Sequence, residues 1–235
     1  MAYLNWIIDE DLQKIVLKLI TKSEKVKKEM EKDFHKNVID PFSALFNTST
    51  FQLSYDKWEK GERRRQEGKK MEYEIGVFHQ RVLGAVDGWK DLGRTRGVDV
   101  KNKQRKIIAE IKNKHNTVKK SDLVHLYNLL HDQVKNKGME YKGYTAYYVP
   151  IIPANKLRYK KLFTPSISKT GEKCGEDERI IEMDGASFYE LVTGDKKALA
   201  NLFQALPTVI MDVSKGKYTV KEIEKVQELF EKAFE

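Results

Sequence analysis

The sequence is poor in the residues that build disulfides and zinc sites. Its 235 residues include one cysteine, Cys174, and five histidines. A single cysteine excludes an internal disulfide and a cysteine-rich zinc site, and no histidine spacing matches a zinc site or a histidine-based metal nuclease. A chain of this length buries a substantial core without cross-links. We expect one domain over residues 1–235, with a core at about 71–152 and helical parts on either side.

Long hydrophobic runs are absent as well. No apolar stretch reaches the length that spans a bilayer. The first residues carry acids at Asp9, Glu10 and Asp11, where a signal sequence would have basic and then apolar residues. We therefore expect a cytoplasmic protein that does not associate with a membrane.

Acidic residues are outnumbered by basic ones. The 44 lysines and arginines exceed the 35 aspartates and glutamates, which gives a net charge of +9. A basic surface favours a polyanionic partner such as nucleic acid. Many of the lysines alternate with glutamate, however, which is typical of an ordinary solvated helix face.

The most informative stretch covers residues 97–117. Two β-type runs, 97–101 and 106–112, flank a polar segment, which predicts a hairpin. Side chains alternate between the two faces of a strand. Ile108, Glu110 and Lys112 should therefore share one face, and Asp99 should lie opposite Glu110 or one step away, within about 5 to 8 Å.

Two carboxylates and a lysine at a strand edge suit phosphodiester chemistry. Asp99 and Glu110, with the backbone carbonyl of Ile111, offer the oxygen ligands that Mg²⁺ takes in proteins. Lys112 would orient or deprotonate the attacking water, or stabilise the transition state. Two other interpretations stay open from these residues alone. The strand is an edge strand carrying solvated charges, or Asp99 and Lys101 supply the acid-x-Lys element, with Asp87 and Asp91 nearby.

Asp99 with Glu110-Ile111-Lys112 resembles the PD-(D/E)xK nuclease signature, although Val98 stands where the motif has proline. The resemblance extends over about residues 4–210 to one family of type II restriction endonucleases, whose members cut GGNCC-type sites. Further segments that carry it are residues 36–46, 78–80, 88–89, 91–93, 107–114 and 141–145.

This resemblance implies an α/β fold: a PD-(D/E)xK restriction-endonuclease-like core with a mixed central β-sheet flanked by helices. It implies an Mg²⁺-dependent enzyme that cuts double-stranded DNA to a 5′-phosphate and a 3′-hydroxyl. Asp99 and Glu110 would hold the metal. Such enzymes often add an acid from a preceding helix, for which Glu74 is a candidate, with Gln80 a comparable supporting residue. A homodimer and a cognate DNA methyltransferase are expected partners.

Residues around the hairpin are candidates for contact with DNA. Arg94 and Arg96 precede it, and arginine is the usual bidentate reader of guanine. Asn113, Lys114 and Asn116 follow Lys112 and suit phosphate or base-edge contacts. An ordinary polar loop is the alternative for these three.

The other elements follow from hydrophobic periodicity. Helices are predicted over residues 4–31, 121–137, 187–192, 196–211 and 220–234, and a buried strand over 144–152. The segments 84–97 and 155–184 are predicted as loops, with Trp89 anchoring the first. Phe42, Leu45 and Phe46 are expected in the core.

Two functions compete with a restriction endonuclease. A repair or recombination nuclease on the same core would recognise DNA structure, and would cut only branched or damaged DNA. A basic DNA-binding protein without catalysis would show salt-sensitive binding, and its behaviour would not change in Glu110→Ala.

Overall fold

The computed structural model describes residues 2–32, 34–93, 97–167 and 170–234. The chain divides into two compact units. Unit 1 comprises residues 1–16 and 76–235, and unit 2 comprises residues 17–75. Helices α1 (Asp9–Lys32) and α3 (Tyr55–Gly84) have residues in both units. The single domain expected from the sequence stays a prediction.

Unit 1 contains a mixed β-sheet, which the described residues form in the order β1-β2-β3-β4-β6-β5. Strands β3, β4 and β6 run parallel, whereas the pairs β1–β2, β2–β3 and β5–β6 are antiparallel. The strands are β1 (Trp89–Asp91), β2 (Val100–Asn102), β3 (Ile107–Lys114), β4 (Thr145–Ile152), β5 (Lys160–Leu162) and β6 (Ile180–Met183).

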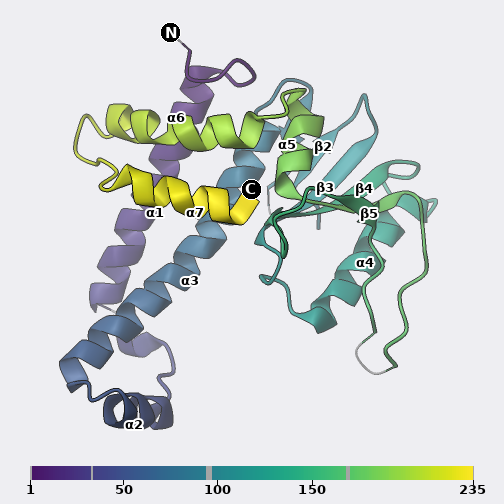
Figure 1. Cartoon of the computed structure of the whole chain (residues 1–235). Coiled ribbons are helices and arrows are strands. Elements are labelled where there is room, and N and C mark those ends of the chain that lie inside the picture. The colour runs from purple at the N-terminus through teal and green to yellow at the C-terminus, as the bar shows by residue number, and fades with distance from the viewer. Residues whose placement is uncertain (1, 33, 94–96, 168–169, 235) are drawn as a thin grey trace. The chain divides into compact units, whose positions relative to one another are not determined.

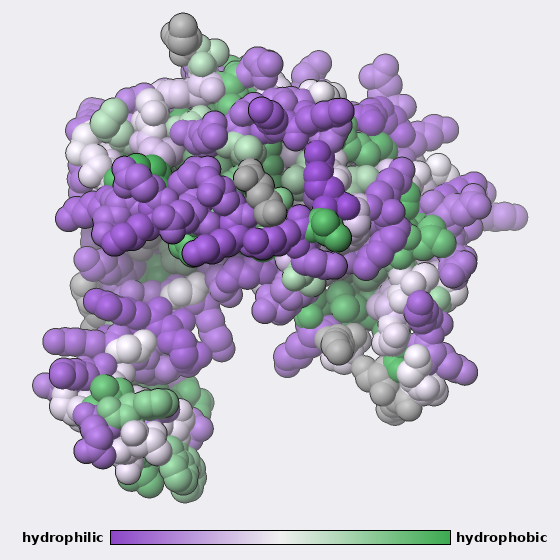
Figure 2. All heavy atoms as spheres, viewed as in Figure 1, coloured by the Kyte–Doolittle hydropathy of each residue, from purple (hydrophilic) through white to green (hydrophobic). Residues whose placement is uncertain are grey.

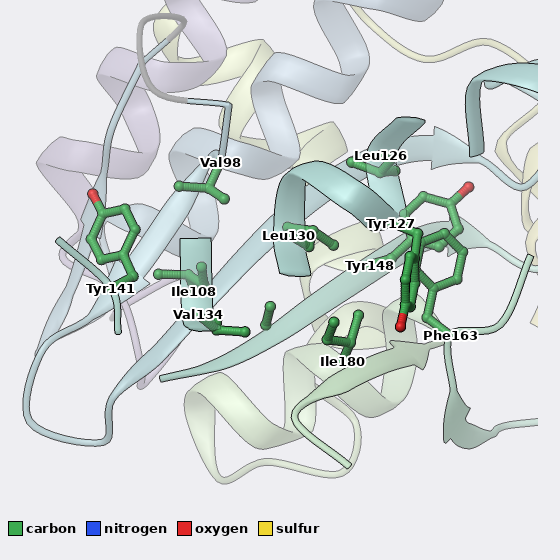
Figure 3. Packing of buried hydrophobic residues seen from close by; sticks show 11 residues of the cluster. Val98, Ile108, Leu126, Tyr127, Leu130, Val134, Tyr141, Tyr148, Phe163 and Ile180 are labelled. Atoms are coloured by element: carbon green, nitrogen blue, oxygen red, sulfur yellow. The ribbon is translucent and has the colours of Figure 1, made fainter. Parts of the chain in front are cut away.

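Helix α4 (Lys120–Lys135) covers one face of this sheet (Figure 1). Leu126, Leu130 and Val134 recur at helical spacing and are buried. They pack over Ile108 and Ile180 of the strands, as Figure 3 shows. The order β2-β3-α4-β4 and the mixed sheet flanked by helices confirm the predicted fold class.

Helix α5 (Gly185–Thr193) packs on the sheet through aromatic contacts. The Phe188 ring lies 5.6 Å from that of Tyr147 and 5.7 Å from that of Trp89, which is buried as predicted. The helix begins very close to the sheet, since a Cβ at Gly185 would lie 2.4 Å from the Ile151 carbonyl oxygen. Only glycine permits this approach.

Two further helices of unit 1, α6 (Ala198–Val213) and α7 (Ile223–Phe234), lie side by side (Figure 1). Phe203 of α6 stacks on Phe230 of α7 with 4.5 Å between ring centroids. Stacked rings at this distance stabilise a helix pair beyond the area they bury. These helices agree with the periodicity of the C-terminal sequence.

Unit 2 contains parts of α1 and α3, the short 3₁₀ helix η1 (Phe34–Lys36) and helix α2 (Pro41–Thr50). The Arg63 guanidinium lies 4.1 Å from the centre of the Phe34 ring. Asn37 Nδ2 donates to Gln66 Oε1 at 2.6 Å. These contacts attach the segment after α1 to helix α3.

Two predictions about loops are wrong. The segment 84–97 contains β1, and the segment 155–184 contains β5 and β6. Strand β5 carries Lys160 and Lys161 at the edge of the sheet, where lysine protects an exposed edge. Strands of three or four residues are too short to give a periodic signal.

The predicted burial of Phe42, Leu45 and Phe46 is also wrong. These side chains are 71%, 63% and 65% exposed. Apolar character predicted burial, but among the described residues no element covers this face of α2. None of the helices in the described part of the chain combines the length and apolar composition that a membrane span needs.

Candidate active site

The antiparallel pairing of β2 with β3 sets the position of Asp99. The ladder between the two strands ends where Val100 pairs with Ala109, and Asp99 comes directly before Val100. The Asp99 amide donates to the Ala109 carbonyl at 2.9 Å. In turn, the Ile111 amide donates to Asp99 Oδ2 at 2.7 Å, which fixes the carboxylate beside β3.

Strand alternation places Glu110 and Lys112 on one face of β3. Lys112 Nζ lies 2.6 Å from Glu110 Oε1, and the two side chains are 32% and 14% exposed respectively. The structure therefore brings Asp99, Glu110 and Lys112 together. Lys101, the lysine of the rival arrangement, instead pairs with Glu140 at 2.7 Å and with Ile108 in the ladder.

The site carries more negative charge than its lysine offsets. Burial, and then the Glu110 carboxylate, raise the pKa of Asp99 to about 7, although the Ile111 amide and Lys112 act to lower it. Burial also raises the pKa of Glu110, despite its ion pair with Lys112. A cation bound to these two carboxylates would favour their ionised forms and so lower both pKa values.

The donor set fits a hard divalent cation. The Ile111 amide bonds to Asp99 Oδ2 and the Lys112 ammonium bonds to Glu110 Oε1. The second oxygen of each carboxylate, Asp99 Oδ1 and Glu110 Oε2, takes no part in these two bonds and could bind a cation. Alternate residues of a strand direct their backbone groups to the same neighbour, so the Ile111 carbonyl faces the side where Asp99 lies and where β2 has ended. Among the described residues no group of three or more histidines, cysteines or acids could hold a metal, and Mg²⁺ typically uses only one or two protein carboxylates.

A buried glutamine supports Asp99 from the other side of the backbone. Gln80, near the end of α3, donates through Nε2 to Asp91 Oδ1 at 2.7 Å and to the Asp99 carbonyl at 3.4 Å. Asp91 also accepts from the Gly93 amide at 2.8 Å. Gln80 and Asp91 belong to sequence segments that carry the family resemblance, and the structure shows that these segments meet.

Sequence reasoning missed Tyr148. It lies on β4 directly beside Glu110 of β3 and Glu182 of β6. Its hydroxyl is buried and has no hydrogen-bond partner in the described part of the chain. Burial, then Glu182 and Glu110, raise the pKa of this hydroxyl. Glu182 accepts instead from Tyr159 Oη at 2.8 Å. Glu110, Tyr148 and Glu182 thus lie side by side across three strands, and only the strand register reveals this arrangement.

The predicted DNA contacts fall in different places. Arg94 and Arg96 lie outside the described residues. Asn113 is 5% exposed and packs near Gly76 of α3, so its side chain would have to move to reach DNA. Lys114 is half-buried at the end of β3 and Asn116 is exposed in the turn that follows. These assignments stay predictions.

Glu74 belongs to unit 2, whereas Asp99, Glu110 and Lys112 belong to unit 1. Within unit 2 it lines a pocket of about 400 Å³. The other lining residues are predominantly lysines of α1 and α3: Lys22, Lys25, Lys69 and Lys70, with Val26, Glu29 and Tyr73. The role of Glu74 in catalysis stays a prediction.

Comparison with known proteins identifies the family. The model of the Eco47II restriction endonuclease family matches residues 4–215. The type II restriction enzyme Eco47II of Escherichia coli is 46% identical over 89% of this chain and 87% of its own length. The type II restriction enzyme Sau96I of Staphylococcus aureus is 31% identical over 89% of this chain and 80% of its own. No solved structure matches. The chain belongs to the Eco47II restriction endonuclease family and is a type II restriction endonuclease.

Proposed function

We propose that this enzyme cuts double-stranded DNA at a short palindromic GGNCC-type site in an Mg²⁺-dependent reaction. The observation that carries the proposal is the meeting of Asp99, Glu110 and Lys112 at the β2–β3 edge. The raised pKa of both carboxyl groups supports a cation between them. The resemblance to a family that cuts GGNCC-type sites supports the sequence specificity.

Asp99 and Glu110 would hold Mg²⁺, with the Ile111 carbonyl as a further ligand. When bound, the ion lowers the pKa of a water, polarises the phosphodiester and offsets charge on the leaving oxygen. The Ile111 amide keeps the Asp99 carboxylate turned toward the site. The pairing of Lys112 with Glu110 holds its ammonium beside the carboxylates that would bind the ion, where it could reach a bound phosphate.

Lys112 would position the attacking water or stabilise charge on the phosphoryl oxygens. Water adds to phosphorus while the bond to the 3′ oxygen breaks. The attacking water loses one proton to solvent and the departing 3′ oxygen takes one up from solvent, so the products are a 5′-phosphate and a 3′-hydroxyl. Each strand of DNA requires one such reaction.

The remaining assignments concern DNA and partners. A net charge of +9 suits a polyanionic substrate. Arg94, Arg96, Asn113, Lys114 and Asn116 are the proposed contacts. A symmetric site is most simply cut by a two-fold homodimer. A cytoplasmic location and a cognate methyltransferase that protects host DNA complete the proposed system, and Glu74 is proposed as an additional catalytic acid.

The decisive experiment is digestion of unmethylated plasmid by the purified enzyme with Mg²⁺, followed by sequencing of the ends. We expect discrete GGNCC-type cuts that disappear in Glu110→Gln and when EDTA replaces Mg²⁺. Cutting restricted to branched DNA would indicate a structure-specific nuclease. Salt-sensitive binding of DNA without any cutting would show that the protein does not carry out the proposed reaction.

A further inference from the structure

Unit 2 exposes an unusual amount of apolar surface around helix α2. We call these residues the α2 patch, and Figure 2 shows green and pale atoms gathered there. Its aromatic and branched side chains are between 36% and 101% exposed: Val38, Phe42, Leu45, Phe46, Phe51, Leu53 and Tyr55. Contiguous exposed apolar surface on a soluble protein marks an interaction site.

Charge is missing from the same stretch. Residues 41–55 contain no charged side chain, in a chain that is 34% charged. Phe42, Leu45, Phe46 and Ser49 follow the spacing of one helix face and are all exposed. An uncharged apolar face does not complement DNA, which is a polyanion. It also lacks the basic residues of a helix that lies on an anionic membrane.

The helix is formed without burying any of its own residues. Asp40 Oδ1 accepts from the amides of Phe42 and Ser43, and Pro41 begins the helix. Thr48 and Thr50 bond to carbonyls within the helix. Nevertheless, no residue of α2 is buried. Because an isolated ten-residue helix is marginal in water, an unpartnered face implies a partner that completes it.

We propose that the α2 patch is the contact surface with a second copy of this chain, related by a two-fold axis. The inference rests on the proposed function, because each chain holds one Asp99–Glu110–Lys112 cluster among its described residues and a symmetric double-strand cut needs two. In an isologous contact the same patch is buried on both copies.

The size of the patch agrees with this occupant. Its four aromatic side chains, at about 150 to 250 Å² each, are all more than half exposed. With the three aliphatic residues they supply several hundred Å², which approaches the ~800 Å² per partner of a standard interface. Aromatic side chains are enriched at the cores of such interfaces.

The test measures the mass of the full-length protein by sedimentation equilibrium at micromolar concentration. We expect two chains for the wild type and for Leu229→Glu, and one chain for Leu45→Glu. The two variants are matched, since Leu45 and Leu229 are 63% and 64% exposed on helices. A two-fold axis brings two new charges together in Leu45→Glu, so its dimer should weaken about 100-fold or more.

A second variant covers the case in which Leu45→Glu disturbs folding. Phe46→Ala removes a ring that is 65% exposed, so circular dichroism should be unchanged. Its dimer dissociation constant should rise about 10-fold or more. A one-chain wild type, a stable dimer in Phe46→Ala, or dissociation by Leu229→Glu would overturn the proposal.

DNA binding, measured alongside, separates the remaining outcomes. Loss of DNA binding in Leu45→Glu with unchanged mass would make DNA the occupant and overturn the dimer surface. An intact wild-type dimer that cuts no DNA would remove the proposed function and keep the interface. Symmetric cutting by a one-chain species would remove the interface and keep the function.

Discussion

Two regions of this enzyme reverse the usual distribution of charge and apolar surface. At the β2–β3 edge, Asp99 and Glu110 are withdrawn from water, and burial raises the pKa of both. At the α2 patch, Phe42 and Phe46 are exposed in a stretch, residues 41–55, that carries no charged side chain. Burying the carboxylates costs folding free energy, and leaving the apolar side chains exposed forgoes the free energy that their burial would supply. Under the proposals above, a bound cation would offset the cost at the first region, and a second copy of the chain would supply the missing burial at the second.

The largest predicted effect tests whether the buried charged residues are needed for cleavage. Lys112→Ala should reduce cleavage about 100- to 1,000-fold, because it removes the cation beside the phosphate. Asp99→Ala should do the same by removing a metal ligand. Initial cleavage rates on plasmid DNA with Mg²⁺ measure both effects.

Lys101→Ala is the matched control for this experiment. Lys101 pairs with Glu140 at 2.7 Å, outside the proposed site, so its loss should change the rate less than about threefold. A Lys101 variant that loses activity as Lys112→Ala does would move the catalytic lysine to the rival position.

Removing the hydrogen bonds by which Gln80 supports Asp99 should reduce cleavage less than removing Asp99 or Lys112. Gln80→Ala removes the donor to Asp91 and to the Asp99 carbonyl, and should lower kcat about 10-fold with little change in KM. Gln66→Ala is the control, because Gln66 is 7% exposed against 6% for Gln80 but bonds to Asn37 in unit 2. Equal losses in both variants would indicate a general folding effect.

Stability should reveal the cost of burying Asp99. Its pKa is raised to about 7, so the folded protein binds this proton more tightly than the unfolded chain. Its contribution to the free energy of unfolding therefore falls as pH rises from about 4 to about 7, and stays low above. Without metal, Asp99→Asn should melt several degrees above wild type at pH 8 and close to it at pH 4.

Asp177→Asn should change stability in the opposite direction to Asp99→Asn, because the pKa of Asp177 is lowered in the folded protein. Burial acts to raise the pKa of Asp177, but hydrogen bonds from Lys135 and the Arg179 amide lower it overall. This carboxylate stabilises the fold above its unfolded pKa, and the stabilisation is lost as pH falls through the lowered value. Asp177→Asn should therefore destabilise at pH 8. Thermal melts at both pH values that moved the two variants in the same direction would contradict this account.

The contrast between the regions also explains what the sequence could predict. The hairpin and the closeness of Asp99 to Glu110 followed from alternation and loop length, which are local properties. Strand β4 and helix α4 followed from long apolar patterns in the same way. The meeting of Gln80 with Asp91, and of Tyr148 with Glu110, depends on contacts between distant segments that no local pattern records.

Burial was the property least accessible from sequence. Apolar residues at Phe42, Leu45 and Phe46 predicted a core because apolar side chains are usually inside, and the structure exposes all of them. The pattern of an amphipathic helix is the same whether its apolar face packs within the chain or against a partner. For that reason the periodicity of α2 marked a surface that needs covering, without saying which molecule covers it.

The smallest predicted effect tests directly whether a second chain covers the α2 patch. If the α2 patch holds two chains together only in the folded state, mass action makes thermal stability depend on protein concentration. A tenfold increase should raise the melting temperature of wild type by about 1 to 3 °C, and Leu229→Glu should behave alike. Leu45→Glu should melt at one temperature throughout, because its patch no longer pairs. Differential scanning calorimetry over a hundredfold range measures the slope. If the wild-type melting temperature did not change with protein concentration, the exposed apolar face would be stable without a second chain. The α2 patch would then not need a bound partner, unlike the buried carboxylates, which are proposed to need a cation.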